Sequence, residues 1–300
     1  CAAKCLVARE GASMNEAAAF ADRGCGGLLP LYESPVRLAR TCAAAGTIAG
    51  SSNSTTGEPR SMSTSPTGPQ INPGEIAGWP MLKIRYRTDA RAIAALLPPG
   101  IAPGREPMVT ITVYNVPIQG EPEYGVVINV DADYAGIAGE YTLALGIDQE
   151  APLFICQELW GQPKYPVQVS YFRLGDRVEA KVLHQGCTFI EFHGEVSATL
   201  PNPPDHETNE WWVKCMRGVD PAKCQYDFPP HVVHVWSKYA TAYLQELAGT
   251  LTLRESAWDP VATLLPMREQ VSARLWTPVF KDRSIKLAGP LDPEGYWPFA

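Results

Sequence analysis

The sequence predicts a mainly β protein, an antiparallel barrel or sandwich with a few short helices. Many segments alternate apolar and polar residues, short turn sequences separate these segments, and helical periodicity is scarce. In residues 108–114, for example, Val109, Ile111 and Val113 fall on one side of the chain. A period of two is typical of strands with one buried face, and many such strands joined by turns favour an antiparallel sheet.

The first predicted element is a short helix over residues 90–97. Thr88 or Asp89 precedes it as a candidate N-cap, and Pro98 ends it. After this helix the period changes to two, which indicates strands. We expect strands over residues 108–114, 124–130, 141–147, 167–172, 177–183, 188–193, 195–200, 232–236, 249–255 and 271–276.

The later part of the chain holds the remaining helical signals. A short helix is expected to begin at Asp259-Pro260, because proline favours the first helical turn. Residues 237–247 are a further helix candidate. Residues 201–230, with two tryptophans and two cysteines, are expected to form a long excursion between strands. That excursion would be a surface loop, a lid or an oligomer contact.

The composition predicts two regions, an extension or linker over residues 1–75 and a β-barrel domain over residues 76–300. The first region is rich in alanine and then in serine, threonine and glycine, which is typical of flexible linkers. We expect it to be disordered. Met62 would make a natural start, with residues 1–61 an upstream extension; an organelle presequence is the alternative.

The overall charge disfavours some classes of partner. The chain carries a formal net charge of −7, whereas binding to nucleic acid or to anionic membranes needs a basic surface. No apolar run approaches the roughly 18 residues of a membrane span. We therefore expect a soluble, cytoplasmic protein that binds neither nucleic acid nor membrane.

The eight cysteines are scattered, and no set of them has the spacing of a zinc site. Cys156 and Cys187 lie within apolar runs that resemble strands, so we expect them to be reduced core residues. His231 and His234 would face opposite sides of a strand, which disfavours a shared metal. We expect neither a metal nor an organic cofactor.

One lysine stands out because of its neighbours. In Glu158-Leu-Trp-Gly-Gln-Pro-Lys-Tyr-Pro166, Lys164 follows the apolar run Leu153-Phe-Ile-Cys156 and lies between Pro163 and Pro166. The prolines restrict the backbone, so the side chain can be aimed. A lysine is a nucleophile only when its amine is neutral, which requires the usual pKa near 10.4 to fall by roughly 3 units at neutral pH. Burial among apolar groups favours that neutral form; a solvated loop lysine is the alternative.

Two blocks of the sequence resemble the acetoacetate decarboxylase family. The pattern Glu158-Leu159, three residues, then Pro163-Lys164 is similar to that family's lysine motif. Tyr86-Arg-Thr-Asp89, followed by Leu97-Pro98, resembles its early signature. The resemblance implies a mostly antiparallel, cone-like β-barrel whose lysine points into the interior. It also implies that this lysine forms a Schiff base with a β-keto acid.

Departures from the family bear on the substrate. The best-known decarboxylases carry a second lysine directly after the nucleophile, and Tyr165 stands at that position. Counted without gaps, the family's pocket arginine falls on Trp79, and its two pocket glutamates fall on Ile111 and Val126. The resemblance therefore implies a hydrophobic chamber with few groups to orient a carboxylate.

The only acidic residues near these positions are Glu121 and Glu123. They flank a proline, so we expect both to be exposed in a turn. Schiff-base chemistry remains compatible with this site, but acetoacetate itself becomes less suitable. A larger or more hydrophobic keto acid is an alternative substrate, and aldol or dehydration chemistry through the same iminium is an alternative reaction.

Five further residues complete the predicted site. Glu158 would act as a general acid or base or hold the lysine loop; we favour the orienting role, because a carboxylate touching the lysine would keep the amine charged. Trp79, Trp160 and Tyr165 are candidates for the pocket wall, with core packing the alternative for the last two. Arg87 would bind a substrate carboxylate or brace the following helix.

The sequence thus predicts a cofactor-free, Schiff-base-forming lyase that decarboxylates an acetoacetate-like β-keto acid. An aldolase or dehydratase using the same lysine is the first alternative. A non-catalytic β-barrel that binds an apolar small molecule is the second. We also expect the protein to form a homo-oligomer.

Overall fold

The computed structural model of the chain describes residues 80–118, 121–220 and 224–300. The predicted extension over residues 1–75 and the candidate Trp79 lie outside these described residues. The described part is mainly β, as the sequence predicts, and its α-helices are short. Most of the predicted strands are present, although several are longer than expected.

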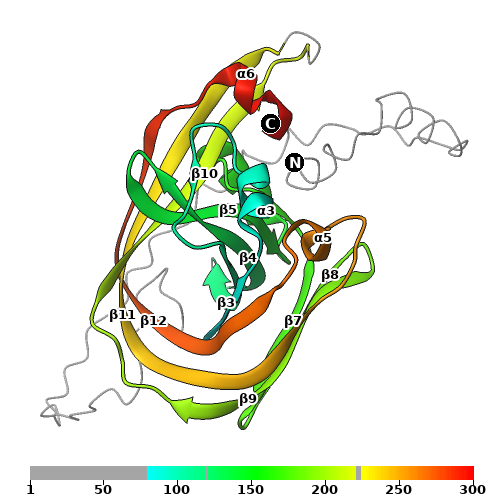
Figure 1. Ribbon diagram of the computed structural model, residues 1–300, viewed down its shortest axis with the longest axis vertical. Coiled ribbons are helices and arrows are strands. Elements are labelled where there is room, and N and C mark those ends of the chain that lie inside the picture. Colours follow the sequence, from blue (N-terminus) through cyan, green and yellow to red (C-terminus); the bar gives the residue numbers. More distant parts are fainter. Residues whose placement is uncertain (1–79, 119–120, 221–223) are drawn as a thin grey trace, which may run out of the picture. The chain divides into compact units, whose positions relative to one another are not determined.

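The elements follow one another from β1 to the C-terminal turn (Figure 1). The strands are β1 (Met81–Arg87), β2 (Ala102–Pro103), β3 (Met108–Ile118), β4 (Glu121–Tyr134), β5 (Ile137–Ile147), β6 (Lys164–Pro166), β7 (Gln168–Leu174), β8 (Arg177–His184), β9 (Cys187–Thr199), β10 (His206–Arg217), β11 (Tyr226–Leu253) and β12 (Glu269–Pro290). The helices are α3 (Ala90–Leu96), α4 (Ala151–Trp160), α5 (Val261–Leu264) and α6 (Pro293–Tyr296), followed by the 3-10 turn η2 (Trp297–Phe299).

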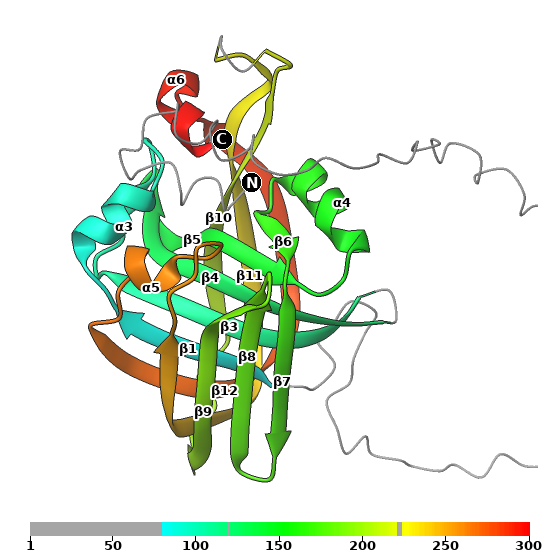
Figure 2. The ribbon, with the colours of Figure 1, turned by 90° about the vertical axis from the view of Figure 1, so that its right-hand side faces the viewer.

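All the strands belong to one sheet, whose main order is β10-β5-β4-β3-β1-β12-β11-β9-β8-β7. Strand β10 pairs with β5 at one end of this order and also with β11. The strands β10, β5, β4, β3, β1, β12 and β11 therefore form a closed ring. The remaining strands β9, β8 and β7 extend from the second half of β11 as a side sheet (Figure 2). The long strands β11 and β12 therefore connect the ring to the side sheet.

Two sequence predictions in the second half of the chain are wrong. Residues 201–230 are not a loop excursion, since β10 and the start of β11 pair there in an antiparallel ladder. Residues 237–247 are not helical but lie inside β11, where β12 pairs along one edge. Pairing and burial of alternate side chains override the local helix preference of this segment.

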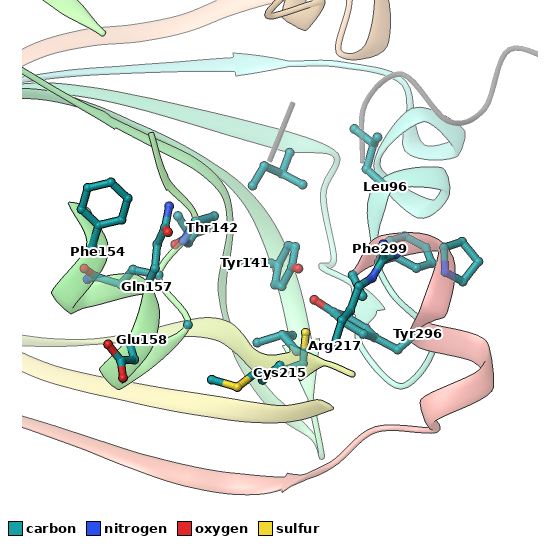
Figure 3. Close-up of a pocket in the computed structure, with 18 of the residues that line it drawn as sticks. Leu96, Tyr141, Thr142, Phe154, Gln157, Glu158, Cys215, Arg217, Tyr296 and Phe299 are labelled. Atoms are coloured by element: carbon teal, nitrogen blue, oxygen red, sulfur yellow. The ribbon is translucent and has the colours of Figure 1, made fainter. Parts of the chain in front are cut away.

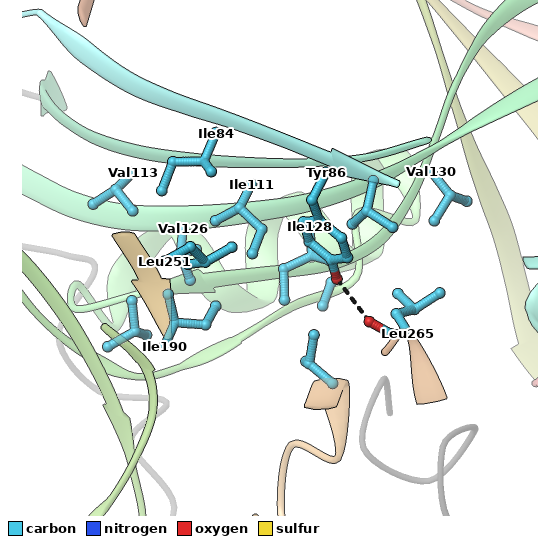
Figure 4. Close-up of a cluster of buried hydrophobic side chains, with 14 of the residues drawn as sticks. Ile84, Tyr86, Ile111, Val113, Val126, Ile128, Val130, Ile190, Leu251 and Leu265 are labelled. Carbon is cyan, nitrogen blue, oxygen red and sulfur yellow. Dashed lines mark hydrogen bonds between the residues drawn. The ribbon is translucent and has the colours of Figure 1, made fainter. Parts of the chain in front are cut away.

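The main hydrophobic core fills the space between the ring and the side sheet. Residues predicted to share one strand face, among them Ile111 and Val113, are fully buried there beside Leu251 and Ile190 (Figure 4). Tyr86 is also fully buried, and its hydroxyl donates a hydrogen bond of 3.1 Å to the carbonyl of Leu265. This bond ties the segment around α5 to the core.

Helix α4 was not expected, because its apolar run resembles a strand. Proline lies in its first turn, and Gly161 ends it with a positive φ of 70°. A Cβ at Gly161 would lie 2.5 Å from the Cα of Lys214, so this position requires glycine for space as well as for conformation. The helix buries Leu153 and Cys156 against the sheet.

The remaining predictions concern two short helices, two cysteines and membrane-spanning segments. The predicted helices near residues 90–97 and after Asp259 are present as α3 and α5. Cys156 is buried, as expected, but in a helix; Cys187 is exposed, contrary to the prediction of a core residue. Among the described residues, no helix has the length and apolar character needed to cross a bilayer.

Candidate active site

Lys164 begins the short strand β6, which runs parallel to the end of β5. Its N–H donates to the carbonyl of Gln162 at 2.7 Å, and its own carbonyl accepts a hydrogen bond from the side-chain amide of Gln157 in α4. Its side chain is only 7% exposed. The Gln157 side chain of α4 thus holds the lysine backbone, a contact that the sequence did not predict.

Successive residues of β6 face opposite sides of the sheet, as in any strand. Lys164 pairs with Leu145, whose side chain belongs to a small cluster with Tyr114 and Leu153 of α4. Tyr165 instead joins the main core. The interior position implied for the lysine is thus taken by Tyr165, while Lys164 is buried under α4, which lies beside β6 (Figure 2).

The partner of Lys164 is Glu123. The Lys164 Nζ lies 3.6 Å from Glu123 Oε2, and Glu123 is only 2% exposed. Tyr114 donates a hydrogen bond of 2.9 Å from its hydroxyl to the other oxygen, Glu123 Oε1. Glu123 Oε2 has no hydrogen-bond partner within the described part of the chain. It is therefore available to exchange a proton with the lysine.

The register of β3 and β4 brings this pair together. Tyr114 lies opposite Gly125, and a Cβ at Gly125 would come within 2.3 Å of the Tyr114 ring. The ring can lie across the strand only because this residue is glycine. Glu123 is two residues earlier on β4 and therefore on the same face, where the Tyr114 hydroxyl reaches it.

Burial controls the protonation of the neighbours. Desolvation, followed by the charge of Glu123, raises the pKa of Tyr114 well above its usual value, so Tyr114 remains a neutral hydrogen-bond donor. Burial also raises the pKa of Cys156, whose thiol is hydrogen-bonded to Lys164. The lysine thus has a carboxylate and a protonated thiol beside it.

Lys164 lines a cavity of about 380 Å³. Leu153, Phe154 and Gln157 of α4 form one wall. Other lining residues come from the end of β5, the start of α4 and β6: Ile147, Asp148, Gln149, Glu150, Tyr165, Pro166 and Val167. A small carbonyl compound fits this volume beside the amine.

The opposite face of β6 has a different polar cluster. The Tyr165 hydroxyl is hydrogen-bonded to Asp259, and burial raises the pKa of Tyr165 well above its usual value. Asp259 Oδ2 also lies 2.7 Å from His184 Nδ1, and the rings of His184 and Tyr165 meet edge to face at 5.2 Å. This cluster joins β6, β8 and the segment before α5.

A second cavity, of about 530 Å³, lies next to α4, and Phe154, Gln157 and Glu158 of this helix line it (Figure 3). It shares Phe154 and Gln157 with the Lys164 cavity but does not include the lysine. Glu158, a predicted catalytic residue, lines this second cavity and is exposed. The structure therefore separates Glu158 from the Lys164 cavity.

The other predicted site residues lie apart from the lysine cavity. Trp160 packs against a separate cluster that contains Trp212, which corresponds to the core-packing alternative. Arg87 forms ion pairs of 3.0 Å with Glu106 and 3.1 Å with Glu269. It lies at the far end of the β1–β3 ladder, six residues along β3 from Tyr114, or roughly 20 Å at the usual rise per residue. Of the predicted wall residues, Tyr165 alone lines the Lys164 cavity in the described structure.

The expectation of an exposed Glu123 is wrong. Glu121 is exposed as predicted, but both residues lie in β4 and not in a turn, and Glu123 is buried. Ile111 and Val126, where the family's glutamates were placed by counting, are fully buried in the main core. The described residues contain no group of three or more His, Cys, Asp or Glu side chains suited to hold a metal ion.

Comparisons with known proteins give a family and close relatives over part of the chain. The family model for acetoacetate decarboxylase (ADC) matches residues 59–288. The acetoacetate decarboxylase of Paraburkholderia phytofirmans is 37% identical over 105 residues, which make up 34% of this chain and 40% of that protein. The match thus spans less than half the length of this curated relative.

Solved structures share the fold at low identity. An acetoacetate decarboxylase structure has a TM-score of 0.62 at 15% identity, covering 70% of this chain and 87% of that one. The enduracididine biosynthesis enzyme MppR, complexed with the condensation product of pyruvate and imidazole 4-carboxaldehyde, has a TM-score of 0.55 at 16% identity. That alignment covers 69% of this chain and 86% of MppR.

Proposed function

We propose that this chain, which belongs to the acetoacetate decarboxylase family, is a Schiff-base-forming lyase that decarboxylates a β-keto acid through Lys164. One observation carries the proposal: the lysine of the family motif is buried, lines a cavity, and has a buried carboxylate oxygen 3.6 Å from its amine. A lysine in such a site can be both desolvated and relieved of its proton.

The first half of the reaction forms the iminium. Glu123 takes a proton from the Lys164 ammonium, and the free amine attacks the ketone carbon to give a carbinolamine. Glu123 then returns a proton to the carbinolamine hydroxyl, which leaves as water. General acid–base catalysis of this kind contributes roughly 10²- to 10⁴-fold.

The second half uses the iminium as an electron sink. The bond between the α-carbon and the carboxylate breaks, carbon dioxide leaves, and the electron pair forms an enamine. A proton added to the enamine carbon restores the iminium, which water hydrolyses to the ketone and the free amine. We propose that solvent supplies that proton, because the nearby Cys156 thiol does not line the cavity.

Aldol or dehydration chemistry through the same iminium is the second candidate. MppR, which shares the fold, has been crystallised with a condensation product of pyruvate and an aldehyde. Both reactions begin with attack of the same amine on a carbonyl, and they diverge only after the iminium has formed. The Lys164 cavity is compatible with either.

The test is to trap the iminium. The protein is incubated with acetoacetate, and separately with pyruvate, in the presence of borohydride, and the modified peptide is located by mass spectrometry. We expect a reduced adduct on Lys164. The adduct should be lost in Lys164→Met and retained in Lys181→Met, a control at the partly exposed lysine of β8.

Product analysis separates the two candidate reactions. Release of carbon dioxide that disappears in Lys164→Met supports decarboxylation, whereas a condensation product without that release supports aldol chemistry. A folded wild-type protein that gives no adduct on Lys164 with any carbonyl compound contradicts both. Ligand-dependent thermal protection that survives Lys164→Met would then favour a binding protein.

A further inference from the structure

We infer that the compound attacked by Lys164 carries a cationic group, such as an amine or guanidinium, which Asp148 and Glu150 bind at the mouth of the cavity. The inference rests on the proposed function, since it takes Lys164 to be the nucleophile. It adds the chemical class of the substrate. For decarboxylation the substrate would be a β-keto acid with a cationic substituent.

The charges around the cavity carry the inference. Its described lining contains two carboxylates, Asp148 and Glu150, and a single cation, Lys164. A third carboxylate, the buried Glu123, lies directly behind the lysine, and its Oε2 has no hydrogen-bond partner in the described structure. A ligand with only negative charge would therefore enter a site with more carboxylates than cations.

Neither carboxylate at the mouth forms an ion pair within the described chain; both lie at the N-terminal end of α4, whose free N–H groups carry only partial positive charge. Asp148 accepts a hydrogen bond of 2.8 Å from the Tyr124 N–H through Oδ1, which fixes the orientation of its carboxylate. No ion pair to Asp148 or Glu150 is formed by any residue in the described ranges. Both residues are exposed, so they are accessible to an incoming ligand.

An aromatic side chain lies at the same opening. Phe154 lines the cavity and is 65% exposed, although large apolar side chains usually avoid water. The face of a phenyl ring attracts ammonium and guanidinium groups. Phe154 and the two carboxylates therefore favour the same type of ligand group.

The strand geometry limits the length of this ligand. Lys164 pairs with Leu145, and Asp148 follows three residues later, or roughly 10 Å at the usual rise per residue. The lysine side chain extends part of the way into the cavity. The cationic group should thus lie only a few bonds from the reacting carbonyl, as in a short amino ketone or amino keto acid.

Three small methyl ketones of similar size test the inference: acetoacetate is anionic, acetoacetamide is neutral and aminoacetone is cationic. The rate of borohydride-trapped adduct formation on Lys164 is measured for each compound. The measurement is made in the wild type and in the double variant Asp148→Asn/Glu150→Gln. Comparing the two proteins compound by compound cancels the different intrinsic reactivities of the three carbonyls.

We expect the double variant to lower the rate with aminoacetone by roughly tenfold, to raise the rate with acetoacetate, and to leave acetoacetamide within about twofold. Asp133→Asn is the matched control, because Asp133 also accepts a backbone N–H, from Gly136, but lies outside the cavity. In the wild type, high salt should reduce the preference for aminoacetone over acetoacetate. This measurement requires no variant to fold.

The outcomes are distinct. If all three compounds give the same variant-to-wild-type ratio and salt changes none of the wild-type rates, the cation site is refuted while the Schiff-base enzyme stands. If no compound modifies Lys164 in the folded wild type, the proposed function fails instead. The cationic substrate is supported if the double variant, but not Asp133→Asn, slows the reaction of aminoacetone, accelerates that of acetoacetate and leaves that of acetoacetamide nearly unchanged.

Discussion

Two consecutive residues of β6 have nearly the same burial but opposite surroundings. Lys164 is 7% exposed and Tyr165 is 8% exposed. Lys164 lies beside a carboxylate with one unbonded oxygen, whereas Tyr165 belongs to the main core and lies beside an aspartate that also contacts His184. The two residues therefore differ not in burial but in the hydrogen bonding of the carboxylate beside them, which is incomplete only at Glu123.

The same contrast explains how the lysine is held. On one face of β6, Tyr165 interacts with Asp259 in the segment before α5, and Asp259 also contacts His184 of β8. These contacts fix the backbone of β6 from that side. The amine on the other face needs no tight packing of its own. Alternation along a strand lets neighbouring residues divide these two roles.

The largest expected effect is on the rate of adduct formation at the face of β6 that carries Lys164. Glu123→Gln should slow adduct formation on Lys164 by roughly 100-fold, because the amide keeps the shape but cannot carry a proton. Borohydride trapping under single-turnover conditions measures this rate. Glu121→Gln, at the exposed neighbour on the same strand, should leave it unchanged.

An increase in the rate for Glu123→Gln would mean that Glu123 only holds the lysine in its charged form. The Lys164 face would then lack a proton carrier, and the mechanism above would be wrong. Near-ultraviolet circular dichroism of both variants checks that the packing is retained.

On the face of β6 that carries Tyr165 we expect a lower stability and little change in the rate of adduct formation. Asp259→Asn weakens the buried bonds to His184 and Tyr165 and should lower the free energy of unfolding by about 2 kcal/mol. Urea unfolding measures this change, with the exposed Asp205→Asn as the control.

Adduct formation in Asp259→Asn should stay within a few-fold of the wild type once the protein is folded. A 100-fold loss of rate with unchanged stability would reverse the assignment of the two faces. It would place the Asp259 cluster in the reaction instead of in the scaffold.

The smallest effect concerns pH. Burial raises the pKa of both Tyr165 and Tyr114 well above the usual value near 10, so the unfolded chain loses these protons before the folded protein does. The stability they contribute is complete below pH 10. It declines as pH rises above 10, by up to about 1.4 kcal/mol per pH unit for each tyrosine.

Tyr165→Phe and Tyr114→Phe should each make the alkaline decline in unfolding free energy shallower, as followed by urea unfolding between pH 9 and 11. The rate of adduct formation distinguishes the two variants. Tyr114→Phe also removes the hydrogen-bond donor to Glu123 and should slow the reaction, whereas Tyr165→Phe should not. Identical slopes in the wild type and in Tyr165→Phe would contradict the role of burial.

Local signals in the sequence were sufficient for the fold class, and they singled out Lys164, whose role stays a prediction. The period of two in residues 108–114 depends on neighbours along the chain, and so does the pattern of proline and lysine around Lys164. Helix α4 was missed because its short apolar run fits a strand as well as a helix.

Glu123 could not be found in this way, because its burial depends on register and on a covering helix. Tyr114 meets Glu123 only when Tyr114 pairs with Gly125, and Leu153 of α4 then packs in the same cluster as Tyr114. The available signal was the glycine in an otherwise apolar strand, which marks a close approach by another group. Strand β10 was missed for a similar reason, since its two partners are distant in the sequence.

The shared strands β11 and β12 determine how this protein can fold. Met81 in β1 must find Trp276 in β12, and β10 must join both β5 and β11 before the ring is closed. Contacts between residues so distant along the chain require a large loss of loop entropy before their favourable energy is gained, so such topologies fold slowly. Because β11 continues without interruption into the side sheet, neither part can form a complete sheet alone. We therefore expect the ring and the side sheet to form together and not one after the other.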